Sequence, residues 1–372
     1  MALFAYKDAV IYPRSKAGAM VKRLYILIIL LLVGVMPLAC TAKDTLPGPE
    51  VLTILTHDSF DIGANVIAEF EAEFNSSVSI VKGGDAGEVI NKSILTKGNP
   101  IADLLYGIDN TFLTRALEEN IFMPYRSPLL DNIPPDYHLD PDHHVMPVNI
   151  GFVAINYDSE WLSAAGLVTP KYLLDLTEPE WTGLLVVQNP ATSSPGLAFL
   201  YSTISKFGET GSYTYLDYWQ DLKENDVLVK NGWSDSYYGD FSLHGGNRPL
   251  IVSYSTSPAA EVFYSEGAHT TPPSGVITSA GSAFMQIEGI GILRGTSHEK
   301  LAKQFVDFAM DTTFQEDFPN RMWVFPVNKL AVTSGVFADF AENPAIPARL
   351  SSQSIALNRD RWIKEWTEIV IR

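Results

Sequence analysis

The chain has 372 residues, of which 46% are hydrophobic and 19% are charged, and its formal net charge is −17. This length and composition predict a globular protein with room for two ordinary domains, and they exclude a disordered or fibrous chain. The acidity argues against a nucleic-acid partner and favours a neutral or cationic small ligand. A single cysteine excludes an intramolecular disulfide, a cysteine-based metal site and a redox pair.

The first element along the chain has the pattern of a targeting segment. A Lys-Arg pair precedes the apolar run LYILIILLLVGVMPLA, which ends next to Cys40. The run is shorter than the roughly 20 residues that span a bilayer, so residues 1–39 are predicted to be a signal peptide. Met20 stands just before the basic pair, and residues 1–19 are expected to be untranslated if Met20 is the initiator.

Cys40 follows a small residue, as at the cleavage and lipidation site of a bacterial lipoprotein. We therefore expect a lipid on Cys40 that anchors the protein at an extracytoplasmic membrane surface, periplasmic or cell-surface. An uncleaved anchor and ordinary secretory cleavage are the alternatives. Residues 40–50 are polar with Pro and Gly, which predicts a flexible tether.

The body of the chain alternates strand and helix patterns. In its first part, strands are predicted at 51–55, 78–82 and 102–108, with helices at 63–74 and around 89–95. The second helix is expected to carry Val89, Ile90, Ile94 and Leu95. This β-α-β-α-β order predicts a parallel sheet covered by helices.

A Pro- and His-rich surface connection at 128–147 precedes a second group of elements. Strands are predicted at 149–158, 184–190, 249–255 and 283–293. A helix with capping-box spacing is expected to open at Thr296, with Glu299 three residues on, and another helix closes the chain around 359–372. Two α/β lobes joined by long strands are therefore expected, with a cleft between them.

Ligands of open α/β sheets lie beyond the carboxyl ends of the strands, so the residues after each strand are candidates for the site. The segments are 57–59, 83–85, 109–110, 189 onward and 254–257. His57, Asp58 and Ser59 suggest a hydrolase, but neighbours on a strand face opposite sides and no G-x-S-x-G motif occurs. A polar cleft loop or helix capping by Asp58 or Ser59 fits them better.

Several other motifs have both a functional and an ordinary structural interpretation. Ser193 and Ser194 open a predicted helix, where they fit a polar-ligand site or an N-cap. Asp85 follows two glycines and either meets a cation or belongs to a turn. Tyr237 and Tyr238 are either phenolate ligands of ferric iron, with His57 and Asp58 as partners, or packing groups at a lobe edge. His143 and His144 are expected to be solvated surface.

Three aromatic residues, Trp233, Tyr254 and Trp323, are each bracketed by polar or Gly-containing loop sequence. Core packing is the ordinary role of such residues. An aromatic cage for a planar or cationic ligand requires the same pattern, because cation–π contacts need rings that reach a cleft.

Seven segments between Val51 and Trp366 carry a family resemblance. They are VLTILTHDSF, IADLLYGIDNTFL, NPATSSPGLAFL, VKNGWSDSY, IVSYSTSPA, FPNRMWVFPVN and RWIKEW. In this order they resemble the thiamine-binding proteins of bacterial ABC importers, within a two-lobed solute-binding class that includes ferric-iron binders. The resemblance implies the type II periplasmic-binding-protein-like fold, with a mostly parallel sheet and flanking helices in each lobe. Residues 51–148 and 281–335 are predicted to form lobe 1, 149–280 lobe 2, and 336–372 a C-terminal helical segment.

The resemblance also implies which residues contact the ligand, by position in the matching segments. They are Asp85, Ala86, Ser193, Ser194, Trp233, Tyr254, Ser255, Thr256, Ser257 and Trp323. His57 belongs to the same site but stands where the family usually shows Tyr, and Asn149-Ile150 stand where it tends to show Asp-Tyr. The segment after Phe60 also lacks a Trp found in some members. These departures predict a weaker cation cage, so a thiamine phosphate or another cationic heteroaromatic stays open as ligand.

The expected function is that of an extracytoplasmic solute-binding protein, which closes its lobes around thiamine and presents it to a membrane permease with an ATPase partner. No cofactor, metal or nucleic acid is expected, and the protein is expected to be a monomer. The alternatives are a ferric-iron-binding protein that uses Tyr237 and Tyr238, and a hydrolytic or thiamine-degrading enzyme. A thiamine-degrading enzyme on this fold needs a cysteine nucleophile in the cleft, and the one thiol is Cys40 at the tether.

Overall fold

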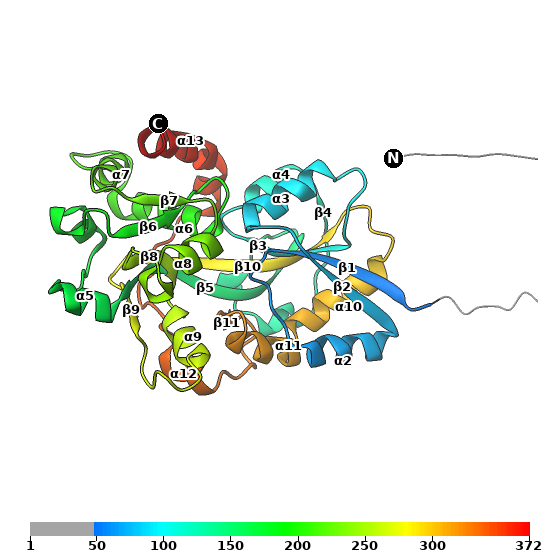
Figure 1. Ribbon diagram of the computed structural model, residues 1–372. Helices are drawn as coiled ribbons and strands as arrows, with labels where there is room; N and C mark the ends of the chain where they lie inside the picture. The colour runs from blue at the N-terminus through cyan, green and yellow to red at the C-terminus, as the bar shows by residue number, and fades with distance from the viewer. Residues whose placement is uncertain (1–47) are drawn as a thin grey trace, which may run out of the picture. The chain divides into compact units, whose positions relative to one another are not determined.

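Strands and helices alternate along the computed structural model, which describes residues 48–372 (Figure 1). The predicted signal peptide and Cys40 lie outside the described residues, as does most of the predicted tether. Residues Pro49–Arg372 form a compact unit of their own. Within the described residues, no helix has the length and apolar character needed to cross a membrane.

The first part of the body builds a parallel sheet. β1 (Glu50–Thr56) lies between β2 (Ser76–Lys82) and β3 (Leu104–Asp109) and is parallel to both. The connecting helices are α2 (Ala64–Phe74) and α3 (Ala86–Leu95). The predicted β-α-β-α-β order is confirmed, and Leu95 at the end of α3 is 85% exposed. The helical twist explains this, because it places Leu95 opposite the face that α3 buries through Val89 and Ile90.

Two long strands cross the middle of the sheet and connect its halves (Figure 1). β5 (Val145–Asp158) and β10 (Phe284–Leu293) are antiparallel, with Phe284 opposite Val153 and Gly291 opposite Val145. The strand order is β2-β1-β3-β10-β5-β8-β6-β7. We call the β1–β3 side lobe 1 and the β6–β8 side lobe 2. The predicted boundary at residue 149 falls inside β5 and stays a prediction.

Lobe 2 continues the sheet with β8 (Leu250–Tyr254), β6 (Leu185–Gln188) and β7 (Leu228–Lys230), while β9 (Ser274–Val276) pairs with β5. Its strands β8, β6 and β7 are mutually parallel, as predicted for a mostly parallel lobe. The α-helices here are α5 (Ser159–Ala165), α6 (Ser194–Phe207), α7 (Tyr215–Glu224), α8 (Trp233–Gly239) and α9 (Ser257–Tyr264). Short 3-10 turns are η3 (Leu173–Thr177), η4 (Pro179–Trp181) and η5 (Ser242–His244).

Lobe 1 is completed by shorter elements. These are α4 (Leu113–Glu118), β4 (Phe122–Met123), η1 (Pro128–Asn132), η2 (Pro135–Tyr137), α10 (Glu299–Met310), α11 (Thr312–Asp317), η6 (Phe318–Asn320) and β11 (Phe325–Pro326). The capping box predicted at Thr296 is wrong, since α10 begins at Glu299. The Thr296 hydroxyl instead donates to Asp103 Oδ1 at 2.5 Å and accepts from the backbone N of His298, the residue before the helix.

The last helix joins the two lobes on one side of the molecule. α13 (Ser352–Val370) starts earlier than predicted and packs against α7 of lobe 2 and α4 of lobe 1, whereas the short α12 (Gly335–Phe340) packs on α9. Trp362 and Trp366 are fully buried, and the Trp366 ring meets Trp219 edge to face at 5.5 Å. The core under α13 therefore contains side chains from both lobes.

Candidate functional site

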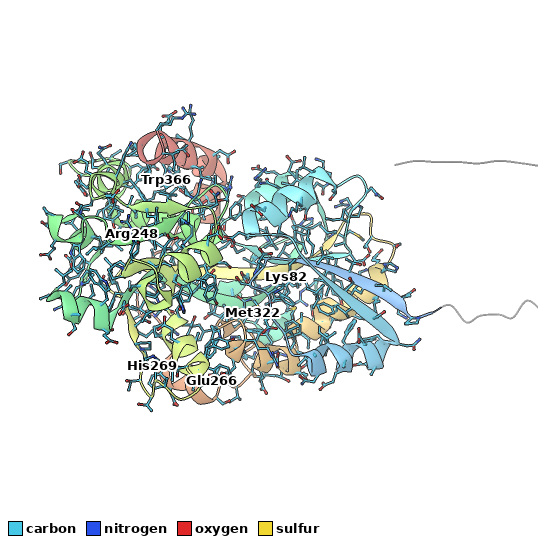
Figure 2. All side chains as sticks on the ribbon, in the orientation of Figure 1. Lys82, Arg248, Glu266, His269, Met322 and Trp366 are labelled. Atoms are coloured by element: carbon cyan, nitrogen blue, oxygen red, sulfur yellow. The ribbon has the colours of Figure 1, made fainter. Side chains whose placement is uncertain are left out.

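A cavity of about 620 Å³ opens where the ends of several strands meet the helices that follow them. Nine of the eleven predicted ligand contacts line it: His57, Asp85, Ala86, Ser194, Trp233, Tyr254, Thr256, Ser257 and Trp323. Met322 and His269, labelled in Figure 2, belong to the same lining. The volume lies in the range of about 300–1,000 Å³ that is typical of small-molecule sites.

Ser193 and Ser255 are not part of the lining and are fully buried behind it. Ser193 is the N-cap residue of α6. The Ser255 hydroxyl donates to the Glu342 carbonyl at 2.6 Å, which fixes the exit of β8 to the segment after α12. The bond of Ser255 suits a residue that holds the wall in place, whereas the Ser193 side chain makes no capping bond.

One aromatic wall is built by α8. Trp233 is its first residue; the ring stacks on Tyr237 with centroids 4.6 Å apart and meets Tyr254 edge-on at 6.4 Å. The indole Nε1–H donates to Ser253 Oγ at 2.9 Å, which fixes the orientation of the ring. The wall is therefore preorganised, and a ligand ring would meet it without reordering it.

The opposite wall comes from the chain between η6 and β11. Trp323 has a left-handed φ of 57°, an unusual conformation for a bulky residue, and stacks on Phe337 at 6.2 Å. Thr256 donates its hydroxyl to the Trp323 carbonyl, so the turn after β8 holds this strained residue. Because Thr256 donates its O–H group within the protein, it can only accept a hydrogen bond from a ligand.

Asp85 connects the lobes inside the cleft. It is the N-cap residue of α3, where Oδ1 accepts from Ala86 N, and Oδ2 accepts from the backbone N of Trp233 at 3.2 Å. The lobes also approach closely at Gly87, where an added Cβ would lie 2.7 Å from the Thr192 carbonyl oxygen. Burial raises the pKa of Asp85, although the hydrogen bonds from Ala86 and Trp233 oppose this.

The floor of the cavity is polar and comes mainly from the crossing strand β10. Gln286 and Glu288 point into the cavity, and Gln286 Nε2 donates to Asp109 Oδ2 at 3.0 Å while its Oε1 accepts from the Tyr254 hydroxyl at 3.2 Å. Burial raises the pKa of Asp109 to about 6. The rule that ligands lie after strands does not select Gln286 and Glu288, because they lie within a strand rather than after one. Their signal is two polar residues at i and i+2 in the otherwise apolar FMQIEGIGIL.

The tandem tyrosines do not present two free phenol groups. Tyr237 is buried and donates its hydroxyl to Glu261 Oε1 at 2.8 Å, and burial raises its pKa further above the ordinary value near 10. Tyr238 is 60% exposed, with its ring nearly perpendicular to Tyr237 at 5.3 Å. Forming a phenolate at Tyr237 would cost a buried hydrogen bond and place two negative charges side by side. This geometry disfavours a ferric site.

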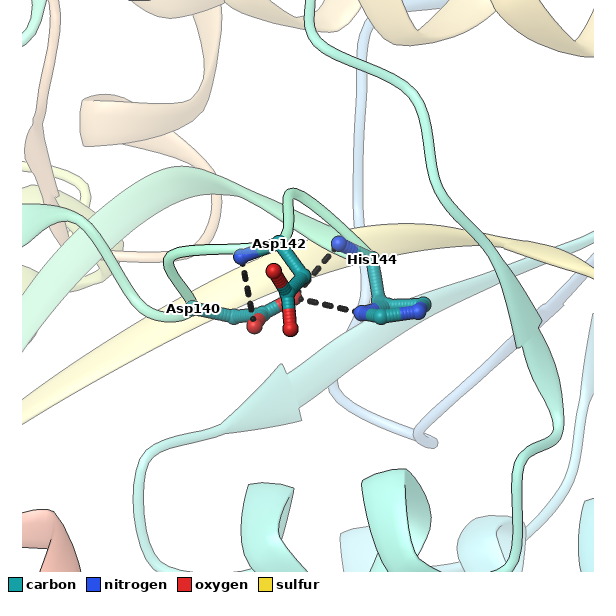
Figure 3. A group of neighbouring side chains, drawn as sticks. All are labelled: Asp140, Asp142 and His144. Carbon is teal, nitrogen blue, oxygen red and sulfur yellow. Dashed lines mark hydrogen bonds and ion pairs between the residues drawn. The ribbon is translucent and has the colours of Figure 1, made fainter.

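Among the described residues, one group of three acidic and histidine side chains has ligand atoms close enough for a metal ion: Asp140, Asp142 and His144 (Figure 3). None of them lines the cavity. The Asp140 carboxylate accepts from the backbone N of Asp142 at 3.0 Å and from His144 Nδ1 at 2.9 Å. These bonds account for the cluster as a turn before β5.

Two lobes that share crossing strands and enclose a cleft with aromatic walls and an acidic floor define a ligand-binding protein of the two-lobed class. Residues 99–348 match the family described as bacterial extracellular solute-binding protein, and this chain belongs to that family. The thiamine-binding periplasmic protein of Brucella suis biovar 1 is 30% identical over 90% of this chain and 94% of its own. The Escherichia coli protein with the same description is 28% identical over 90% of this chain and 97% of its own.

Solved structures agree on the fold. A periplasmic thiamin binding protein aligns with a TM-score of 0.76 and 26% identity over 87% of this chain and 97% of that one. The ferric binding protein from Campylobacter jejuni aligns with a TM-score of 0.69 and 20% identity, over 86% and 99% of the two chains. The predicted two-lobed periplasmic-binding-protein fold is confirmed, and the fold is shared by proteins described as binding quite different ligands.

Proposed function

We propose that this protein binds thiamine in the cavity outside the cytoplasm and presents it to the permease and ATPase of an ABC importer. One observation carries the ligand class: the cavity combines aromatic walls at Trp233, Tyr254 and Trp323 with a floor that holds the carboxylate of Glu288. A flat, positively charged heteroaromatic molecule complements both features. Within this ligand class we choose thiamine, because relatives of this chain are described as thiamine-binding proteins.

Within this proposal the side chains have distinct roles. Trp233, Tyr254 and Trp323 contact the two rings, with His57 on the lobe 1 side of the cavity. Asp85 accepts from the amino group of the ligand or attracts its charge. Ser194 lines the cavity at the start of α6, where we assign its hydroxyl a hydrogen bond to the ligand, and Ala86 provides close contact beside it.

Titration calorimetry of the unit from Pro49 to Arg372 tests the proposal, with thiamine, thiamine monophosphate and ferric iron as ligands. We expect saturable binding of thiamine with one site per chain. We also expect weaker binding of the phosphate ester, because Asp58, Asp85, Glu261 and Glu288 line the cavity and repel an anion. Ferric binding with phenolate colour and no heat from thiamine would contradict the proposal and favour the iron alternative.

The proposed attachment to a membrane depends on the predicted signal peptide and on Cys40. We propose that Cys40 is lipidated and anchors the body to a membrane through the tether. The test is to express the full chain and a Cys40→Ser variant and compare them by membrane fractionation and fatty-acid labelling. Label on the parent and its loss from the variant would support the anchor. Equal labelling, or an unlabelled parent, would contradict it.

The proposal describes a binding protein rather than an enzyme. Residues 48–372 contain no cysteine, so the nucleophile that a thiamine-degrading enzyme requires is absent from this part of the sequence. Incubation with thiamine followed by chromatography should return the vitamin intact. Release of the pyrimidine or thiazole half would contradict this proposal.

A further inference from the structure

His57 and Glu288 face each other across the floor of the cavity. His57 follows β1, and its ring packs on Gly107 of β3 so closely that an added Cβ would lie 2.3 Å from His57 Cδ2. His57 Nε2 lies 3.5 Å from Glu288 Oε1, an ion-pair distance that is long for a hydrogen bond. The two side chains are 11% and 9% exposed, so Gly107 lets the imidazole sit deep beside a buried carboxylate.

Both groups are held in place by neighbours. The other oxygen of Glu288 accepts from Asn149 Nδ2 at 2.8 Å, and the same amide lies 3.2 Å from the Tyr106 hydroxyl. Burial raises the pKa of Tyr106, so this phenol stays neutral. Asn149 is where the sequence analysis noted a missing carboxylate; here it supports Glu288, which supplies a carboxylate nearby.

The charges around the pair are unbalanced. Besides Glu288, the carboxylates of Asp85 and Asp109 also raise the pKa of His57. Within the described part of the chain, the cavity lining holds one arginine and no lysine. That residue, Arg321, pairs with Asp317 at 2.9 Å and Asp61 at 3.7 Å. His57 is therefore the group placed to neutralise Glu288 when the cleft contains no ligand.

We propose that Glu288 is the counter-charge for the positive ring of the ligand, and that protonated His57 occupies this role in the empty cleft and releases its proton to solvent when the ligand binds. The inference rests on the proposed function, in which the ligand is the thiazolium cation thiamine. One positive charge enters and one proton leaves, so the charge of the floor is unchanged by binding.

Electrostatics gives the direction of the coupling. Burial lowers the pKa of His57, but Glu288, with Asp85 and Asp109, outweighs this and raises the pKa above its usual 6.5. A cation beside Glu288 opposes this rise and lowers the pKa again. Affinity for thiamine should thus increase with pH, by at most about tenfold per pH unit, and level off above the pKa of His57.

Other groups at the cavity titrate in the same range. Asp109 and Glu261, whose pKa values burial raises to about 6 and about 7, also become negative as the pH rises and so attract a cation. The pH profile of the parent alone does not separate these contributions. The coupling is therefore assigned by differences between ligands and between variants.

The first experiment uses the unmodified protein. Calorimetric titrations near about pH 6.5, in buffers of different ionisation enthalpy, count the protons released on binding. We expect release with thiamine and almost none with an analogue in which a neutral thiophene replaces the thiazolium. Equal release with both ligands would overturn the inference. If neither ligand binds, the proposed function fails instead.

The second experiment uses variants. His57→Gln should bind thiamine with less proton release and a flatter pH profile than the parent. His298→Gln is the matched control, because His298 also pairs with a carboxylate, Asp103, at 3.0 Å but does not line the cavity. It should keep the parental proton release. Identical release in His57→Gln and the parent would overturn the role of His57.

Glu288→Gln tests the counter-charge. It should weaken thiamine binding by roughly 10- to 100-fold while changing affinity for the neutral analogue much less, as expected when a desolvated charge pair is lost. An equal loss for both ligands would show that Glu288 supports the cavity without recognising charge, and would overturn its role as the counter-charge.

Discussion

The two lobes meet along two contrasting regions. On one side, α13 covers both lobes with an apolar contact in which Trp362 and Trp366 are fully buried. On the other side, the cleft joins the lobes through hydrogen bonds such as those from Trp233 N to Asp85 and from Thr256 to the Trp323 carbonyl, beside polar atoms such as Ser194 Oγ that have no partner among the described residues. The contact under α13 is mainly apolar, although the indole N–H groups of Trp362 and Trp366 have no partner among the described residues, whereas the cleft presents polar groups to a ligand.

The difference indicates how stability and binding are divided. Apolar burial under α13 contributes to folding whether or not a ligand is present. Buried polar atoms in the cleft cost free energy until a ligand pairs them, so the cleft is stabilised mainly by what it binds. Substitutions under α13 should therefore change the free energy of unfolding, and substitutions in the cleft should change the affinity.

The largest effect is expected from Trp366→Ala. Removing a fully buried tryptophan leaves a cavity beside Trp219 and should lower the free energy of unfolding by about 3–5 kcal/mol. Urea denaturation measures this, and Leu357→Ala on the exposed side of α13 is the control, with a change within about 0.5 kcal/mol. Thiamine affinity should stay close to the parental value at temperatures where the variant is folded. A large loss of thiamine affinity would contradict the proposal that the α13 contact determines stability and the cleft determines binding.

Trp233→Ala is expected to cause a smaller free-energy change, and this change is in thiamine affinity rather than in stability. Loss of the ring that faces the cavity should weaken thiamine binding by about 1.5–3 kcal/mol, the range of a binding-site aromatic residue. Calorimetry measures the affinity, and urea denaturation should show a smaller loss of stability than for Trp366→Ala. Unchanged affinity would place Trp233 in the core of lobe 2 and out of the site.

Trp233→Phe separates the ring from its hydrogen bond to Ser253. If the ring face is what the ligand contacts, the phenylalanine variant should retain more affinity than the alanine variant. Equal losses in both variants would assign the effect to the lost indole N–H and its positioning of the wall.

The periodicity of the sequence predicted the sheet well, because alternation of apolar strands and amphipathic helices is a local signal. It failed at Thr296, where the Ser/Thr-x-x-Glu spacing is local but the competing partner, Asp103, is 193 residues away. Pairings of this kind are decided by the tertiary structure.

The candidate site shows the same contrast between what local sequence predicts and what the tertiary structure decides. The rule that ligands lie after strands brought Asp85, Trp233 and Tyr254 to one cavity, because carboxyl ends of neighbouring strands share an edge. It gave no hint of the floor, because Glu288 lies within β10 and faces the cavity only where that strand crosses between the lobes. It also placed Ser255 with its neighbours in the lining, although Ser255 lies in the turn after β8 and its hydroxyl is bonded to the Glu342 carbonyl behind the wall.

The smallest effect is expected at Glu261, where the cleft itself affects stability. Glu261 accepts hydrogen bonds from Tyr237 and Ser274, and burial raises its pKa from 4.5 to about 7. Because the folded state holds this proton more tightly than the unfolded state, the stability contribution is present at low pH and is lost as the pH rises from about 4.5 through about 7. Glu261→Gln removes the titrating group.

The stability of Glu261→Gln relative to the parent should therefore improve as the pH rises, by about 1–2 kcal/mol between roughly pH 5 and pH 8. Urea denaturation at several pH values measures the difference in stability. The amide loses one of the two hydrogen-bond acceptors of the carboxylate, which lowers stability at every pH. The test is therefore how the difference changes with pH and not its size at one pH. Glu266→Gln, at an exposed carboxylate labelled in Figure 2, provides the comparison and should show a flat difference. A flat difference for Glu261→Gln as well would mean that water reaches this carboxylate, and that the polar cleft contributes as little to the pH dependence of stability as the apolar side under α13.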